Sequence, residues 1–196
     1  MIALTELLKG QKKTLILDES FVDFSEEENA SLFRQDILNN YPNLVLIKSL
    51  SKSYGISGIR LGVLASGNKE IIKDVHARLS SRNINSFAEY FLQIIGKYQK
   101  DYHLSCKKLI AERERFRNLL HKTNLLHVYP SQANYFLCRI IKNDTASELA
   151  ERLLWEHDIL IKDLSGKKGI PDKSYIRVAI RNLFENDVFL KKLYRE

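Results

Sequence analysis

The residues best suited to chemistry lie in one short segment, positions 49–62, which reads Ser-Leu-Ser-Lys-Ser-Tyr-Gly-Ile-Ser-Gly-Ile-Arg-Leu-Gly. Lys52 follows an apolar run, a setting that can destabilise an ammonium and favour the nucleophilic amine. The hydroxyls of Ser49 and Ser51 can donate to a phosphate, and Arg60 can hold a phosphate with two N–H groups. The glycines allow a ligand to approach the backbone closely. We therefore predict a site for a phosphorylated ligand, with Lys52 as its nucleophile.

Two alternatives for this segment are less favoured. A lone lysine among serines and glycines is usually part of a solvated loop, but here the whole pattern argues against that interpretation. The segment is not a phosphate-binding P-loop, because that motif requires glycine directly before the lysine, where this sequence has Ser51.

The segment resembles the cofactor-lysine signature of pyridoxal-phosphate enzymes of the aspartate aminotransferase fold, class I/II. That signature is Ser-x-Ser-Lys, followed by small residues and then Gly-x-Arg-x-Gly, which here stands at 58–62. The resemblance implies that pyridoxal 5′-phosphate is the cofactor and that Lys52 is the catalytic residue, bonded to the cofactor aldehyde. It also implies that Ser49, Ser51 and Arg60 bind the cofactor phosphate.

A second stretch, Asp-Glu-Ser-Phe at 18–21, resembles the family's Asp-Glu-Ala-Tyr strand end. On its own Asp18 would be an ordinary turn residue. The resemblance implies that its carboxylate pairs with the protonated pyridine nitrogen. Phe21 stands where many transaminases have a tyrosine, and it can pack on the cofactor but cannot donate. This departure resembles the threonine-phosphate decarboxylase branch, close kin of histidinol-phosphate aminotransferases. Glu19 and Asp23 have no comparable support and are expected to be surface or turn residues.

The C-terminal third contains two further stretches of the same resemblance. Asn134 lies in an Ala-Asn-Tyr strand start, and Arg177 lies in a strand whose arginine holds the substrate α-carboxylate. Both are therefore expected to bind substrate. Lys162, which replaces an arginine of the family, either assists at a distal anion or is simply exposed. Arg181 either lies on the same strand face as Arg177 or forms a strand-end salt bridge.

The elements that must position these residues alternate along the chain. Apolar runs predict strands at 14–17, 43–47, 58–65, 135–140, 159–161 and 175–180, with helices at 30–39, 146–157 and 184–194. Asn68 and Ser86 are expected to cap helices, and the run from 86 to 121 is expected to form a bent or two-part helix.

These elements predict an α/β fold. The resemblance makes it the C-terminal part of the large domain of a PLP transferase, with a mainly parallel sheet, followed by a small α+β domain. Residues 1–100 would form the partial large domain, 101–122 a connecting helix and 123–196 the small domain.

Composition excludes several other classes of protein. The 196 residues are 44% hydrophobic, with no apolar run long enough for a membrane span and no visible export signal. Two cysteines, Cys106 and Cys138, favour buried thiols in the cytoplasm. The histidines lack the spacing of metal ligands, so no metal is expected.

The net charge of +7 is densest over 97–122, where a solvated helix face is favoured over nucleic-acid binding. Trp155 is expected in the core.

The function implied is a PLP-dependent aminotransferase that moves an amino group between an amino-acid or amino-phosphate substrate and a 2-oxo acid. The alternatives are a threonine-phosphate-type decarboxylase, a non-catalytic remnant that kept the fold, and an RNA-binding module. By the resemblance the chain covers only the C-terminal half of a family member. A homodimer, or completion by an N-terminal half, is therefore expected.

Overall fold

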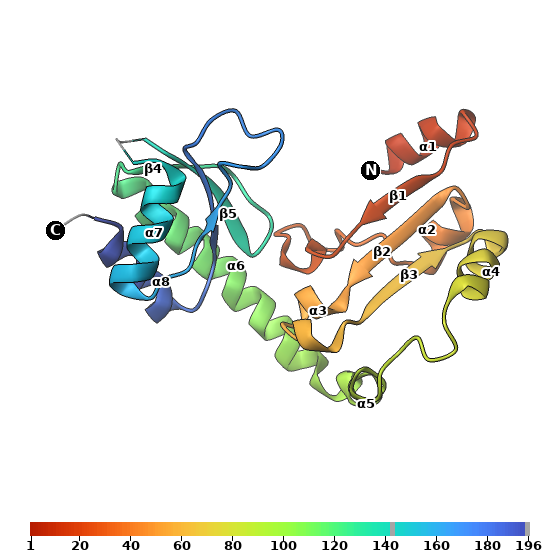
Figure 1. The fold of residues 1–196 in the computed structure, drawn as a ribbon. Helices are drawn as coiled ribbons and strands as arrows, with labels where there is room; N and C mark the ends of the chain where they lie inside the picture. Colours follow the sequence, from red (N-terminus) through yellow and green to blue (C-terminus); the bar gives the residue numbers. More distant parts are fainter. Residues whose placement is uncertain (142–143, 195–196) are drawn as a thin grey trace. The chain divides into compact units, whose positions relative to one another are not determined.

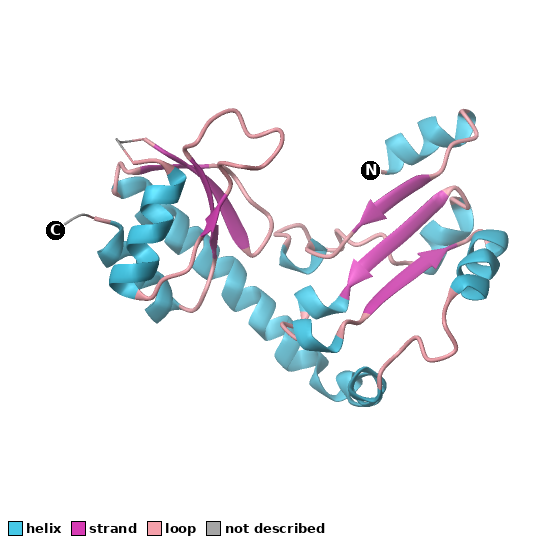
Figure 2. Ribbon diagram, in the orientation of Figure 1, coloured by secondary structure: helices cyan, strands magenta, loops and turns pink. Residues whose placement is uncertain are grey.

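The computed structural model describes residues 1–141 and 144–194, which divide into two compact units, Met1–His103 and Leu104–Glu196. Both units contain helices and strands (Figures 1 and 2). Each unit has its own small sheet, as the α/β pattern of the sequence predicts.

The first unit is built on a three-stranded sheet. Its strands are β1 (Leu15–Asp18), β2 (Leu44–Ser49) and β3 (Gly62–Ser66), in that spatial order. β1 and β2 are parallel, whereas β3 runs antiparallel to β2. Three consecutive residues of β2, Leu44, Val45 and Leu46, are buried, as expected of a central strand covered on both faces. The parallel pairing brings the carboxyl ends of β1 and β2 to one edge of the sheet.

Short helices lie before, between and after these strands. They are α1 (Ile2–Gly10), α2 (Gln35–Asn40), α3 (Leu50–Ser53), α4 (Lys69–Arg78) and α5 (Ser86–Ile94), with 3₁₀ turns η1 (Val22–Phe24), η2 (Ser57–Ile59) and η3 (Ile95–Tyr98). Asn68 caps α4 as predicted, accepting from two backbone N–H groups. The predicted cap of α5, Ser86, is wrong by one residue. Asn85 caps the helix instead, because its side chain accepts from the Ala88 N–H and also donates to the Ile59 carbonyl.

The second unit packs helices on one face of a four-stranded antiparallel sheet. Helix α6 (Gln99–Lys122) runs from the first unit into the second, so the predicted two-part helix is present as α5, η3 and α6. The strands are β4 (Leu126–Val128), β5 (Tyr135–Ile140), β6 (Lys162–Asp163) and β7 (Tyr175–Ala179), in the order β4-β5-β7-β6. Helices α7 (Ala146–His157) and α8 (Leu183–Leu193) complete the unit. Its core joins Phe116, Leu153 and Phe189 of α6, α7 and α8 to inward residues of β4, β5 and β7.

Three sequence predictions of local structure need correction. The strand expected at 159–161 begins only at Lys162, and the strand expected from 58 begins at Gly62, because η2 occupies 57–59. The helix expected from 30 begins at Gln35.

The expectation that Trp155 is a core residue is wrong, since its side chain is 81% exposed. Helix α7 buries Ala146, Leu149 and Leu153. Two residues beyond Leu153 is a rotation of about 200° around an α-helix, so Trp155 lies on the outer face. In the described part of the chain, no helix is both long and apolar enough to cross a membrane.

Candidate functional site

One open cavity of about 650 Å³ in the first unit collects most of the residues singled out from the sequence. Asp18 at the end of β1, Ser49 at the end of β2, Lys52 in α3 and Arg60 after η2 all line it. A volume of this size is typical of small-molecule sites. The sheet therefore brings together side chains that are up to 42 positions apart in the sequence.

The carboxylate of Asp18 is held by its neighbour Ser20. The Ser20 backbone N–H donates to Oδ1 at 2.8 Å, and the Ser20 hydroxyl donates to the same oxygen. These hydrogen bonds lower the pKa of Asp18 below its ordinary value, and the positive charge of Lys52 adds to the effect. Asp18 is thus held as an anion facing the cavity.

Ser20 is a site residue that the sequence analysis missed. It is buried, and its hydroxyl oxygen accepts from the Ser49 N–H at 2.9 Å. Its carbonyl accepts from the Ser53 hydroxyl at 3.3 Å. These contacts tie the end of β1 to the start of α3, and so fix Asp18 relative to Lys52. A serine two residues after a strand-end aspartate is typical of an Asx turn, a signal that predicts the bond of Ser20 to Asp18 but not its contacts with Ser49 and Ser53.

The amine of Lys52 is exposed and lies over an aromatic ring. Its Nζ is 5.1 Å from the ring centroid of Phe21, the position where the sequence predicted a cofactor contact. A cation–π contact at an exposed site stabilises by about 0.5–1 kcal/mol, which a reacting group easily displaces. Among the residues that the structure describes, none makes a recorded ion pair or hydrogen bond with this amine.

Ser51 and Arg60 hold the turn between α3 and β3. The buried Ser51 hydroxyl accepts from the Leu61 N–H at 3.0 Å and donates to the Leu61 carbonyl at 3.3 Å. Its predicted contact with a phosphate stays a prediction. Arg60 has φ +54° and ψ +44°, a left-handed conformation that is uncommon away from glycine and is often retained at functional sites. Its guanidinium is exposed, with one contact to the Ser57 carbonyl at 3.4 Å.

Glu19 and Asp23 were expected to be surface or turn residues; neither is a surface residue, although Asp23 does lie in the 3₁₀ turn η1. The side chain of Glu19 is buried, and it accepts from the Leu32 N–H at 2.8 Å and from the Ser31 hydroxyl at 2.7 Å. Asp23 accepts from the ammonium of Lys48 at 2.5 Å. These carboxylates were missed because their partners come from segments distant in the sequence.

Lys48 is a second lysine lining the cavity, four positions before Lys52. Its side chain is 15% exposed and that of Asp23 is 18% exposed, so their ion pair is largely removed from water. The other oxygen of Asp23 accepts from the Tyr102 hydroxyl at 2.5 Å. The ring of Tyr102 in turn stacks on Tyr54, with 4.0 Å between centroids.

The remaining candidates, Asn134, Arg177 and Lys162, belong to the second unit. Arg177 is exposed on the strand face away from the helices, with its guanidinium 5.1 Å from the ring centroid of Tyr135. Lys162 is its register partner on β6, so two cations stand side by side. The Asn134 carbonyl accepts from the Ile180 N–H at 2.9 Å, which fixes the end of β7.

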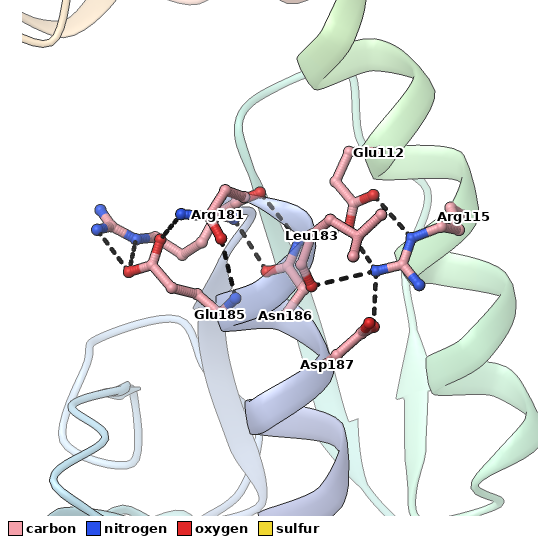
Figure 3. Close-up of polar contacts among 8 residues, drawn as sticks. Glu112, Arg115, Arg181, Leu183, Glu185, Asn186 and Asp187 are labelled. Atoms are coloured by element: carbon pink, nitrogen blue, oxygen red, sulfur yellow. Dashed lines mark hydrogen bonds and ion pairs between the residues drawn. The ribbon is translucent and has the colours of Figure 1, made fainter.

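Arg181 lies beyond the end of β7 and forms the strand-end salt bridge, one of the two alternatives given by the sequence. Figure 3 shows its guanidinium paired with Glu185, at 2.8 Å. Its backbone N–H donates to Asn186, which is 1% exposed and also donates to Glu112 of α6 at 2.8 Å.

Three arginines of the basic block at 97–122 are engaged inside the second unit. Arg115 pairs with Glu112 and with Asp187, as Figure 3 shows, while Arg117 pairs with Glu114 and Arg113 is buried. The exposed positive charge of this block is smaller than the sequence suggests.

The residues around the cavity fit the cofactor that the resemblance implies. They supply an exposed amine from Lys52, an ionised carboxylate from Asp18 and an exposed guanidinium from Arg60. A pyridine-aldehyde phosphate needs these three kinds of partner. Within residues 1–141 and 144–194, no cluster of three or more metal-ligating side chains is present.

Comparison with known proteins identifies the family of this chain. The model of the family "Aminotransferase class I and II" matches residues 2–193. A CMP-5′-(3-aminopropyl)phosphonate synthase from Streptomyces rubellomurinus is 34% identical over 92% of this chain and 28% of its own length. A threonine-phosphate decarboxylase from Salmonella typhimurium is 33% identical over 97% of this chain and 50% of its own length.

The solved structures agree as well. The histidinol-phosphate aminotransferase of Clostridium acetobutylicum superimposes with a TM-score of 0.87 at 32% identity, over 98% of this chain and 56% of that one. The chain thus spans about half the length, or less, of these relatives. Because the family model covers nearly every residue, the chain belongs to the class I and II aminotransferase family, for which pyridoxal 5′-phosphate is the cofactor.

Proposed function

We propose that this chain carries the lysine-bearing half of a pyridoxal-phosphate-dependent aminotransferase. The observation that carries the proposal is the shared cavity, which Asp18, Ser49, Lys52 and Arg60 line together. The substrates would be an amino acid or amino phosphate and a 2-oxo acid, since relatives named for histidinol phosphate and threonine phosphate are similar over almost the whole chain.

Each residue has a distinct task in this proposal. When bound, the cofactor supplies a ring that accepts electrons from the substrate Cα. Lys52 would bind the aldehyde carbon of the cofactor, and its amine would carry a proton to or from the substrate Cα. Asp18, held as an anion by Ser20, pairs with the protonated ring nitrogen. Arg60 and Ser49 bind the phosphate.

The second unit supplies the recognition of the substrate. Arg177 would bind the α-carboxylate, because a planar guanidinium matches a carboxylate. The face of Tyr135 restricts the range of positions that the Arg177 side chain adopts. Lys162 lies beside Arg177 in register and would suit a second anionic group on the substrate. Asn134 would contribute to the same substrate site.

Decarboxylation is the second candidate function. Phe21 supports it, because this ring cannot donate to the cofactor as a tyrosine would. The relatives named as decarboxylases support it too, since they are as similar to this chain as those named as aminotransferases. The two reactions differ in which bond at Cα breaks, and an assay for carbon dioxide distinguishes them from amino transfer to a 2-oxo acid.

Completion of the site by further chain is part of the proposal. The relatives extend over about twice the length of this chain, so an N-terminal half would supply further contacts to the cofactor. A homodimer is the expected assembly. A cytoplasmic location stays a prediction from the cysteines, both of which are buried thiols with no disulfide.

The test is binding of the cofactor to the full chain. Pyridoxal phosphate is added to the natural protein and to Lys52→Ala, and the absorbance of the lysine-bound cofactor is recorded. We expect the band with the natural protein and its loss in Lys52→Ala. Asp18→Asn should weaken binding while keeping the lysine. Equal spectra for the natural chain and Lys52→Ala would favour the non-catalytic remnant. Retention of oligonucleotides at low salt would favour the RNA-binding alternative.

A further inference from the structure

Two lysines of this chain line the same cavity, but in the proposed function only one of them, Lys52, forms the bond to the cofactor aldehyde. Lys48 at the end of β2 and Lys52 in α3 both border the hollow that Asp18 and Arg60 share. A lysine amine attacks an aldehyde carbon through its nitrogen lone pair, and water leaves as the carbon–nitrogen double bond forms. An ammonium has no lone pair and cannot react in this way.

The two side chains are held in very different ways. The ammonium of Lys48 is 2.5 Å from a carboxylate oxygen of Asp23, in a pair whose side chains are 15% and 18% exposed. The second oxygen of Asp23 accepts from the Tyr102 hydroxyl, which keeps the carboxylate turned toward Lys48. Lys52 is exposed and rests on the face of the Phe21 ring.

We propose that Asp23 prevents Lys48 from reacting with the cofactor aldehyde, so that Lys52 is the lysine that reacts. Its carboxylate holds the side chain of Lys48 in an ion pair, so the Lys48 nitrogen would have to leave Asp23 before it could attack the aldehyde carbon. Lys52 forms no ion pair or hydrogen bond with a described residue, although the charge of Asp18 acts on it, and its cation–π contact with Phe21 releases it at little cost. Asp23 is thus a positioning residue for the proposed function, and this inference rests on that function.

Neighbouring contacts fix Asp23 itself. It lies in η1, whose chain begins directly after Phe21, and η1 is closed by backbone hydrogen bonds from Val22 to Glu19 and from Phe24 to Phe21. Tyr102 stacks on Tyr54, so its hydroxyl is held from a second direction. The carboxylate therefore has a defined position before any ligand arrives.

The experiment maps which lysine takes the label. The full chain is incubated with pyridoxal phosphate, reduced with borohydride and mapped by mass spectrometry, with exposed Lys73 of α4 as an internal reference. In the natural chain we expect the label at Lys52 and little at Lys48. Asp23→Asn, which has the same shape without the charge, should raise labelling of Lys48 relative to Lys73 by roughly three- to tenfold, the range for loss of a partly buried pair.

Three controls accompany the test, so that it depends neither on folding alone nor on the cofactor. Asp23→Glu retains a carboxylate and should keep labelling of Lys48 low. Trace acetylation with acetic anhydride reads the reactivity of Lys48 without any cofactor, and should rise by a similar factor in Asp23→Asn. Lys48→Arg, which keeps the cation, should leave labelling of Lys52 unchanged.

The outcomes separate the two proposals. If Lys52 of the natural chain is labelled no more strongly than Lys73, the proposed function is contradicted. Strong labelling of Lys52 together with equal labelling of Lys48, or no change at Lys48 in Asp23→Asn by either reagent, would overturn the role of Asp23 alone.

Discussion

Replacing Ser20 by alanine tests whether the contacts that join β1 to α3 hold the site together. The substitution removes a buried hydroxyl that donates to Asp18 and accepts from the Ser49 N–H at 2.9 Å. An amide left without its partner costs roughly 1–3 kcal/mol. The bond to Asp18 adds less than a buried one would, because this carboxylate is largely solvated. We expect the free energy of unfolding to fall by roughly 2 kcal/mol at pH 7.

The effect should shrink in acid, which distinguishes it from simple loss of packing. The pKa of folded Asp18 lies below its ordinary value of 3.8, so its stabilising contribution is present above that value and is lost as pH falls through the folded pKa. Ser20→Ala removes the largest cause of the lowered pKa. The difference between the natural chain and Ser20→Ala should therefore be larger at pH 7 than at pH 3.

Urea titrations at both pH values, followed by circular dichroism, measure this difference. Ser66→Ala is the matched control, because the Ser66 hydroxyl donates to the Leu44 carbonyl at 2.8 Å and accepts from the Asn68 N–H, with no carboxylate involved. Its loss of stability should not depend on pH in this range. Equal losses for Ser20→Ala at pH 7 and pH 3 would refute the link to Asp18.

Three further predictions concern packing and hydrogen bonds elsewhere in the two units. Gly67→Ala would place a Cβ 1.9 Å from the Leu38 carbonyl oxygen and should lower the free energy of unfolding, measured in urea, by about 3 kcal/mol. Gly10 has open space around it, so Gly10→Ala should have no such effect, and similar urea midpoints for the two variants would contradict this prediction. Asn186→Ala leaves the part-buried N–H and carbonyl of Arg181 without their side-chain partner and should cost roughly 2 kcal/mol in the same assay. A loss under about 1 kcal/mol would argue against the network of Figure 3. Thr145→Ala breaks the capping box of α7 and should cost about 1 kcal/mol in thermal melts; an unchanged melting temperature would count against the cap.

Local signals in the sequence were sufficient for much of the fold. The strand and helix at 135–140 and 146–157 form over the predicted residues, because period-two burial and the capping box at Thr145 are both local properties. The cavity residues Asp18, Lys52 and Arg60 could be selected because their segments resemble motifs of the family. Asp18 and Lys52 also lie at or just after the ends of two parallel strands, and such ends meet at one edge of a sheet.

The rest depends on contacts that no local pattern carries. Ser20 looks like a turn residue, and only the pairing of β1 with β2 brings it to the Ser49 amide. Asp23 accepts a hydrogen bond from Tyr102, which lies 79 positions later in the chain. The failed prediction for Trp155 has the same cause, because the face of α7 that is buried depends on the sheet beneath it.

The exposure of Trp155 has a practical consequence for anyone who studies this chain in solution. It is the sole tryptophan, and its indole is already surrounded mostly by water in the folded state. Its fluorescence emission should therefore shift little when the protein denatures, and a flat fluorescence trace would say nothing about whether the fold had been lost. The same indole should respond readily to added iodide or acrylamide, and a drop in that quenching on mixing with another macromolecule would reveal that the outer surface of α7 had become covered.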